Sequence, residues 1–100
     1  MNQNTYDLIN EQLAPLARTS LTNAYQNMQG KIPEMMHGVM LMKAATNFSE
    51  EMKVSSFPMI FTLLRFKFGQ SFSLDHSEYK SAVEKITQTV LAEFVKLPSS

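Results

Sequence analysis

Two histidines are the side chains of this sequence best suited to acid–base or metal chemistry near neutral pH. His37 and His76 lie far apart along the chain, and neither has an acidic or histidine neighbour at the spacing that would place two ligands on one helical face. Glu34 precedes His37 by three residues, which allows at most a weak contact between carboxylate and imidazole. Catalysis and metal binding both need such a partner. We therefore expect no catalytic residue and no metal ligand, and both histidines are interpreted as surface side chains or neighbours of a helix cap.

The other patterns that could carry chemistry are short. Glu50 and Glu51 are adjacent, and successive helical positions point about 100° apart, so the two carboxylates cannot form a catalytic pair. Ser77 and Lys80 match the Ser-x-x-Lys of penicillin-interacting enzymes, but a chain of 100 residues lacks room for that fold. The sequence has no cysteine, and its three glycines are too far apart to cradle a phosphate. We expect a protein that is not an enzyme and holds no cofactor.

The composition fits one folded unit with no strongly charged partner. Apolar residues make up 44% of the chain, and nine basic residues balance nine acidic ones. Zero net charge is not typical of a nucleic-acid binder or of a protein held on an anionic membrane. The N-terminus lacks the features of a secretory signal, and no run of about eighteen apolar residues is present. We expect a single domain over residues 1–100, located in the cytoplasm, with no nucleic acid and no membrane among its partners.

Apolar residues recur with a helical period in four segments. The first spans about 5–28 and contains Pro15, where we expect a kink or a break into two coaxial pieces. The second runs from Pro33 to about residue 53. The fourth begins at Asp75, which forms a capping-box pattern with Glu78, and stops at Pro98. Its face around Tyr79 predicts a well-defined amphipathic helix.

The third segment, 57–68, is apolar almost all round, which is typical of a central, buried helix. The residues Ser-Ser-Phe-Pro begin it and Gly69 ends it. The sequence therefore predicts an all-α fold, a small bundle of four or five helices with a central apolar helix around residues 57–68. The alternative is an α+β fold with a short hairpin around 60–74, because aromatic and polar residues alternate on both sides of Gly69.

Some apolar residues lie outside the arcs that would face this core. Eight residues are methionine, and two of them, Met36 and Met40, share a side of the second segment with Lys43. On the fourth segment, Leu91 and Val95 are four residues apart on an otherwise polar side. Ordinary packing or contact with a partner would explain each pair. We predict a candidate interface made of Met36, Met40, Leu91 and Val95.

These features favour a non-enzymatic protein-interaction module, such as a small adaptor, chaperone or inhibitor, that acts through apolar helical faces. Its expected partners are a protein of unknown identity and a second copy of the chain in a homodimer. The alternative is a carrier of a small apolar ligand, held between the second and third segments. A nucleic-acid-binding regulator is less favoured, because Asp75 and Glu78 would point at phosphate from the start of the fourth segment.

Overall fold

The predicted helical periods are realised in four α-helices, which a computed structural model describes over residues 1–95. They are α1 (Gln3–Met28), α2 (His37–Ser55), α3 (Phe57–Phe68) and α4 (His76–Phe94), and a short 3₁₀ turn, η1 (Glu34–Met36), precedes α2. No strand occurs within residues 1–95, so the all-α prediction is confirmed and the hairpin around 60–74 is wrong. The predicted stop at Pro98 lies outside the described residues.

Side chains or a glycine set three of the helix ends, and those at Gly69 and Asp75 lie where the sequence predicts. Ser56, in the predicted start of α3, makes no side-chain cap bond. The Asn2 side chain accepts a hydrogen bond of 2.8 Å from the Thr5 amide at the start of α1. Asp75 caps α4 by accepting from the amide and the hydroxyl of Ser77, at 2.9 and 3.1 Å. Gly69, at φ 111°, ends α3 in a backbone conformation that residues with a Cβ rarely adopt. These contacts close the helices where regular hydrogen bonding ends.

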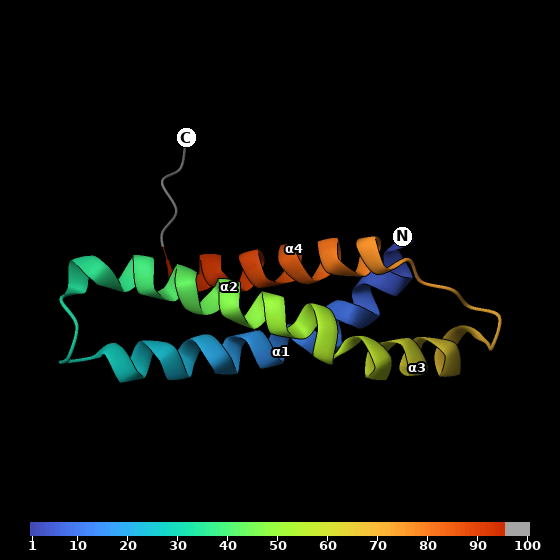
Figure 1. Ribbon diagram of the computed structural model, residues 1–100, viewed down its shortest axis with the longest axis horizontal. Helices are drawn as coiled ribbons and strands as arrows, with labels where there is room; N and C mark the ends of the chain where they lie inside the picture. The colour runs from blue at the N-terminus through green and yellow to red at the C-terminus, as the bar shows by residue number, and fades with distance from the viewer. Residues whose placement is uncertain (96–100) are drawn as a thin grey trace.

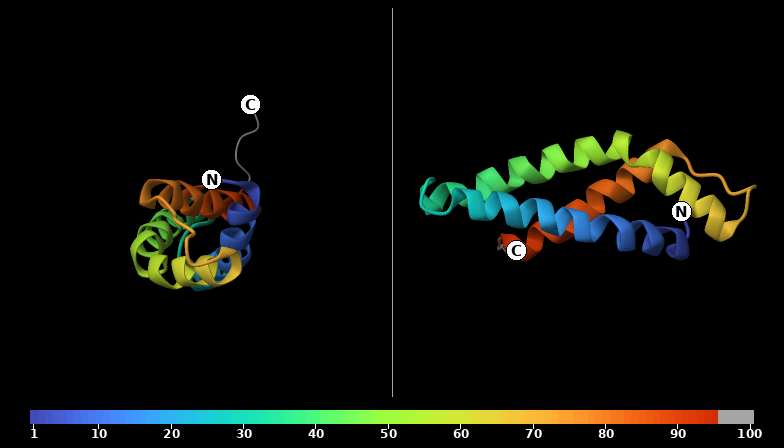
Figure 2. Two further views of the ribbon diagram at one scale, coloured as in Figure 1. Left: turned by 90° about the vertical axis from the view of Figure 1, so that its right-hand side faces the viewer. Right: turned by 90° about the horizontal axis from the view of Figure 1, so that it is seen from below.

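Helix α1 passes through Pro15 without a break. The helix is continuous from Gln3 to Met28, so the expected division into two pieces is wrong. Its N-terminal half turns toward α4, as Figures 1 and 2 show, which agrees with the expected kink. Pro15 is exposed, so the carbonyl that lacks a donor in the preceding turn can bond to water.

Helices α1, α2 and α4 run side by side and enclose the core, while α3 lies at one end of the molecule (Figure 1). The α1–α2 turn is at the opposite end. The core draws on all four helices, but α4 supplies more buried residues than α3 does. The largest fully buried side chains of the core include Tyr79, Ile9, Leu13, Leu21, Leu41, Ile60, Leu64, Ile86 and Leu91.

The predicted central position of residues 57–68 is wrong, although the segment is helical over the expected range. Only Ile60 and Leu64 of α3 are buried, whereas α4 buries seven residues. Helix α4 contacts both α1 and α2, and α1 and α2 also contact each other, so the three long helices share the core and α3 packs on α1 and α2 at its edge. Because α3 follows α2 after a single residue, Ser56, it extends beyond the end of the bundle and cannot lie between the long helices.

Candidate protein-binding surface

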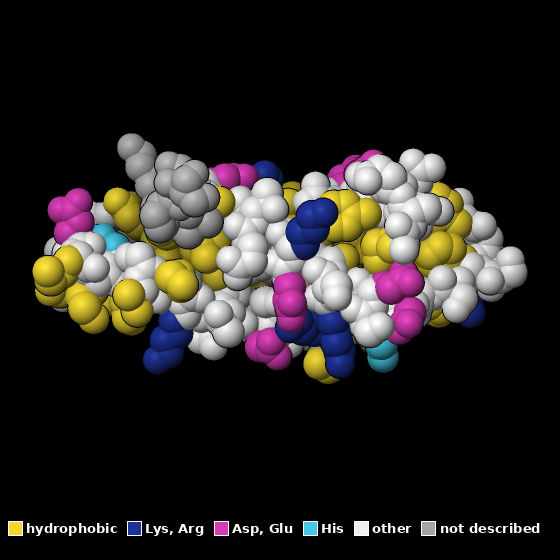
Figure 3. All heavy atoms as spheres, turned by 90° about the horizontal axis from the view of Figure 1, so that it is seen from above, with side chains coloured by type: hydrophobic (Ala, Val, Ile, Leu, Met, Phe, Trp, Pro, Cys, Tyr) yellow, Lys and Arg dark blue, Asp and Glu magenta, His cyan; other side chains and the backbone are white. Residues whose placement is uncertain are grey.

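Exposed apolar side chains gather at the two ends of the molecule. One group belongs to η1 and the first half of α2, and Figure 3 shows apolar side chains crowded at that end of the surface. The other group belongs to α3 and includes Met59, Phe66 and Phe68. Large apolar side chains that gather on a monomer surface are typical of sites that bind other molecules.

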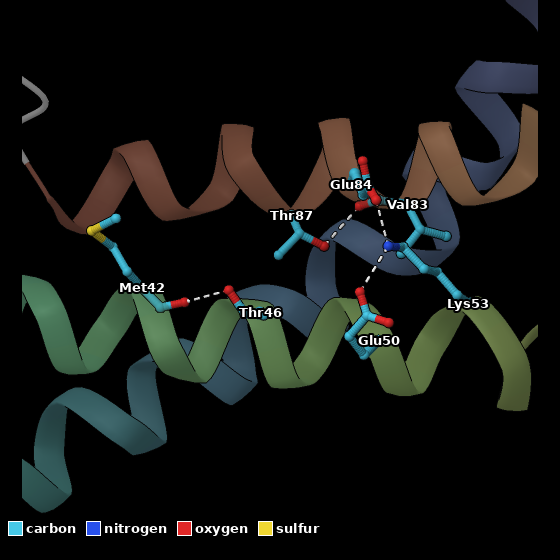
Figure 4. A network of polar contacts seen from close by, with 7 residues as sticks. All are labelled: Met42, Thr46, Glu50, Lys53, Val83, Glu84 and Thr87. Atoms are coloured by element: carbon cyan, nitrogen blue, oxygen red, sulfur yellow. Dashed lines mark hydrogen bonds and ion pairs between the residues drawn. The ribbon is translucent and has the colours of Figure 1, made fainter.

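The first group forms a row that we call the methionine stripe, defined as Met35, Val39 and Met42. These side chains are 86%, 61% and 51% exposed, respectively. Their spacing places them on one side of consecutive helical turns. Thr46, one turn further along, donates a hydrogen bond from its hydroxyl to the Met42 carbonyl at 3.0 Å (Figure 4). The Thr46 hydroxyl therefore already has a partner within its own helix.

Contacts on the other sides of α2 hold the stripe outward. A His37 ring nitrogen lies 2.9 Å from the Ile32 carbonyl oxygen, and Tyr25 meets the same ring edge-on with centroids 5.8 Å apart. Gly38 packs toward α4, because a Cβ at this position would lie 3.8 Å from Cγ1 of Val95. The His37 ring therefore closes the α1–α2 turn, and His37 is the first residue of α2, next to a helix cap as the sequence analysis expects.

The four residues of the predicted interface do not form one surface. Met36 is 44% exposed beside the stripe, and Met40 and Val95 are half-buried and pack against the core. Leu91 is 2% exposed, so the expectation that it lies outside the core is wrong. Because α4 is covered by two helices, its buried arc is wider than a single apolar stripe and includes Leu91.

Sequence reasoning missed the exposed residues that matter most at each end. Met35 and Met42 belong to the exposed stripe, although the sequence-based prediction singled out only Met36 and Met40 on that segment. Phe66 is exposed, although it lies in the segment predicted to be central. The available signal at Phe66 is its sequence context, since Arg65 and Lys67 flank it on both sides. A basic residue on each side of an aromatic one indicates that the surrounding helix surface reaches water.

The polar groups between α2 and α4 are bonded to one another. Lys53 forms ion pairs with Glu50 on its own helix and with Glu84 on α4 (Figure 4). The hydrogen bond to Glu84 is the main cause that raises the pKa of Lys53, and the bond to Glu50 adds to it. The interaction crosses the helix interface and orients α2 against α4 at the surface.

A second polar contact lies deeper, where Tyr79 and Ser56 share a buried hydrogen bond between their hydroxyls. Burial raises the pKa of the Tyr79 phenol, and the bond to Ser56 opposes that shift in part.

Ser49 is also buried, with its hydroxyl unpaired to any group of residues 1–95. Within the same range, no three His, Asp or Glu residues come together as metal ligands. The second histidine, His76, packs on the Phe57 ring with centroids 3.9 Å apart.

Two shallow grooves border the two ends. One, of about 370 Å³, lies between the end of α1 and the start of α2 and is lined mainly by Met28, Ile32, Met40 and Ala44. The other, of about 260 Å³, contains Phe68 and Lys67 beside the first half of α1. Neither lies between the second and third segments, where a ligand carrier was expected to have its pocket. A third groove of about 260 Å³ lies there, lined by Val54 of α2, Phe57 and Pro58 of α3, and His76.

Comparison of the chain with protein families, curated proteins and solved structures gives no match. Across residues 1–95, none of the helices has the length and apolar character needed to cross a bilayer. Any functional conclusion therefore depends on the surfaces described above.

Proposed function

We propose that the chain is a non-enzymatic protein-interaction module that pairs with a second copy of itself through the methionine stripe. The observation that carries this proposal is the row of exposed apolar side chains at Met35, Val39 and Met42. Apolar anchors at i, i+4 and i+7 are the pattern by which a helix docks against another protein. Methionine suits such a contact because its flexible side chain adapts to the opposing surface.

The charges beside the stripe support a second copy as the partner. Glu34 precedes the stripe and Lys43 follows it, so its two ends carry opposite charges. When the twofold axis is perpendicular to α2, the two copies of the helix run antiparallel, which brings Glu34 of one copy toward Lys43 of the other. The stripe itself contains no charged residue, so pairing buries no unpaired charge.

The expected affinity follows from the burial of three side chains on each copy. Covering a large apolar side chain is worth about 1.5–3 kcal/mol when it is fully exposed beforehand, and these three are half to mostly exposed. Association and side-chain ordering offset a large part of that gain. We therefore expect a reversible dimer that dissociates on dilution.

Molar mass measured by light scattering over a range of concentrations tests this proposal. The mass should rise from 11.4 kDa toward twice that value as the concentration increases. Met35→Glu combined with Val39→Glu should hold the mass at the monomer value while the circular dichroism stays helical. Phe66→Ser is the matched control, because it removes an equally exposed apolar side chain from the opposite end. A wild-type mass that stays monomeric at every concentration contradicts the proposal.

A carrier of a small apolar ligand is the second candidate, favoured by the 370 Å³ groove beside Met40. This volume lies within the range of small-molecule sites. Native mass spectrometry of protein purified from its host should then show a bound small molecule that Met40→Glu removes. A partner that is a second copy would instead leave the monomer mass free of any adduct.

A further inference from the structure

Helix α3 presents an apolar face to solvent. Ile60 and Leu64 point into the bundle and are fully buried. Phe66 and Met59 lie on the opposite side of the helix and are 86% and 56% exposed. Thr62 lies between them, and its hydroxyl donates to the Pro58 carbonyl at 2.9 Å, so the outward face has no free hydroxyl donor from α3.

Two cations border this face symmetrically. Arg65 and Lys67 each lie about 100° around the helix from Phe66, one on either side. Arg65 is held in place, because its Nε donates to the Phe72 carbonyl at 3.1 Å and its guanidinium lies 4.5 Å from the Phe61 ring centroid. Because that bond uses Nε, the terminal NH₂ groups of the half-buried guanidinium are the donors left to meet an anion at the edge of the apolar face.

The charged residues of α3 and of its flanking segments are all basic. Residues 54–74 contain no aspartate or glutamate, and Arg65 and Lys67 are their only charged residues. Asp7 and Glu11 of α1 line a groove together with Lys67, and no ion pair within residues 1–95 joins either carboxylate to it. A second copy of α3 would bring like charges together, whereas an anionic surface would complement them.

The position of α3 in the fold also limits what can cover it. Figures 1 and 2 show α3 at the end of the molecule, extending past the three long helices. Its outward face therefore projects from the molecule, and a projecting apolar face flanked by cations fits a broad anionic surface. Apolar side chains that enter the acyl boundary, with cations at the level of the headgroups, are one way in which a helix binds an anionic bilayer.

We propose that α3 docks the protein on anionic lipid bilayers, with Phe66 and Met59 entering the acyl boundary and Arg65 and Lys67 at the level of the phosphates. The proposal goes beyond the sequence-based expectation of no membrane partner, and it concerns peripheral contact, because no helix of residues 1–95 is long and apolar enough to span a bilayer. It does not depend on self-association, because the methionine stripe lies at the opposite end of the molecule.

Cosedimentation with vesicles tests the proposal directly. The full chain should bind vesicles of phosphatidylcholine with about 30% phosphatidylserine more tightly than pure phosphatidylcholine, by roughly twentyfold or more at low salt, since each basic residue near the surface contributes about fivefold. Lys67→Gln should weaken binding by about fivefold. Lys31→Gln, an exposed lysine remote from α3, is the charge control and should change little.

The apolar contribution is tested by Phe66→Ser combined with Met59→Ser, which should abolish vesicle binding. Leu16→Ser is the control, because Leu16 is 46% exposed on α1 and lies outside both apolar ends. Circular dichroism and thermal unfolding establish that each variant is folded. Since the chain has no tryptophan, Phe66→Trp also supplies a single fluorophore whose emission should shift to the blue only with anionic vesicles.

Three results would overturn the proposal. The first is no binding of the wild-type chain to anionic vesicles at millimolar lipid. The second is equal binding by the wild type and the folded double serine variant. The third is an absence of vesicle binding together with capture of an acidic amphipathic peptide that requires Phe66, which would assign α3 to a groove of another protein. None of these results bears on the dimer, whose mass is measured without lipid.

Discussion

Helices α3 and α4 follow one another in the chain but use their apolar residues in opposite ways. In α3, three of twelve residues are polar, yet only Ile60 and Leu64 are buried. In α4, charged and polar residues are frequent, yet seven of nineteen residues are buried. The more apolar helix is thus the more exposed one.

This difference shows that the separation of polar from apolar residues places a helix better than its total apolar content does. Helix α4 carries its apolar residues on one broad arc and can be covered by α1 and α2 while its charges stay in water. Helix α3 has apolar residues on every side, so burial of one side leaves Phe66 outside. An all-round apolar helix at the end of a bundle is therefore a surface feature.

The largest expected effect comes from a charge placed in the buried arc of α4. Leu91→Glu should unfold the chain, because a carboxylate at this 2% exposed position loses its hydration. Helical circular dichroism measures the outcome. Leu91→Met is the control and should cost less than about 1.5 kcal/mol, since it conserves volume. A folded Leu91→Glu variant with a lowered mass would instead place Leu91 at a subunit interface.

Next in size is the loss of a buried side chain from α3. Leu64→Ala should lower the free energy of unfolding by about 2–5 kcal/mol, because Leu64 is fully buried. Phe61→Ala should lower the free energy of unfolding by less, since Phe61 is half-buried. If α3 were central, both side chains would be buried and the two variants would lose similar amounts. Urea unfolding measures both values. An equal cost for the two variants would contradict the position of α3 at the end of the bundle.

A smaller effect is expected where α4 makes its buried polar contact. Tyr79→Phe removes the hydroxyl that bonds Ser56 and should cost about 1 kcal/mol in urea unfolding. The same change at the exposed Tyr25 serves as the control and should be nearly neutral. Ser56 lies between α2 and α3, so a neutral result at Tyr79 would show that α4 does not fix that junction.

Lowering the pH should slightly reduce the stabilisation that the carboxylates at the two ends of α4 provide. Helix α3 has no carboxylate and should lose no such stabilisation. Bonds from the Ser77 amide and hydroxyl lower the pKa of Asp75, and the hydrogen bond from Arg18 lowers the pKa of Glu93. A lowered pKa means that the stabilisation is present above the ordinary carboxylate pKa and is lost as the pH falls through the lowered value. Thermal unfolding between about pH 6 and 3 measures this loss. Asp75→Asn combined with Glu93→Gln should flatten the profile.

The smallest effect on stability is expected at Phe66. Phe66→Ala should change the free energy of unfolding by no more than about 0.5 kcal/mol, because the side chain has little to lose in the isolated chain. Comparing the stability lost in Phe66→Ala with that lost in Leu64→Ala distinguishes the outward face of α3 from its inward face. A cost above about 2 kcal/mol would mean that Phe66 is covered in solution.

The sequence predicts the local structure well and the number of neighbours of each helix poorly. The proline after Phe57 and the glycine after Phe68 mark the ends of α3 correctly, because both act through the backbone. The Tyr79 face of α4 is also predicted correctly. Leu91 was misplaced because a helical wheel assumes one covered face, whereas α4 packs against two helices. Which helix extends past the bundle depends on the junction at Ser56, and periodicity carries no information on it.

The long, flattened shape of the molecule has a consequence for its hydrodynamics. The backbone spans 51 × 29 × 18 Å, and its radius of gyration of 15.2 Å exceeds the roughly 13 Å of a compact domain of this length. Such a particle has more translational friction than a sphere of equal mass. A monomer will therefore elute from a sizing column ahead of globular standards of 11.4 kDa and sediment more slowly than they do. Early elution accompanied by slow sedimentation is the signature of the elongated monomer, whereas a dimer would sediment faster.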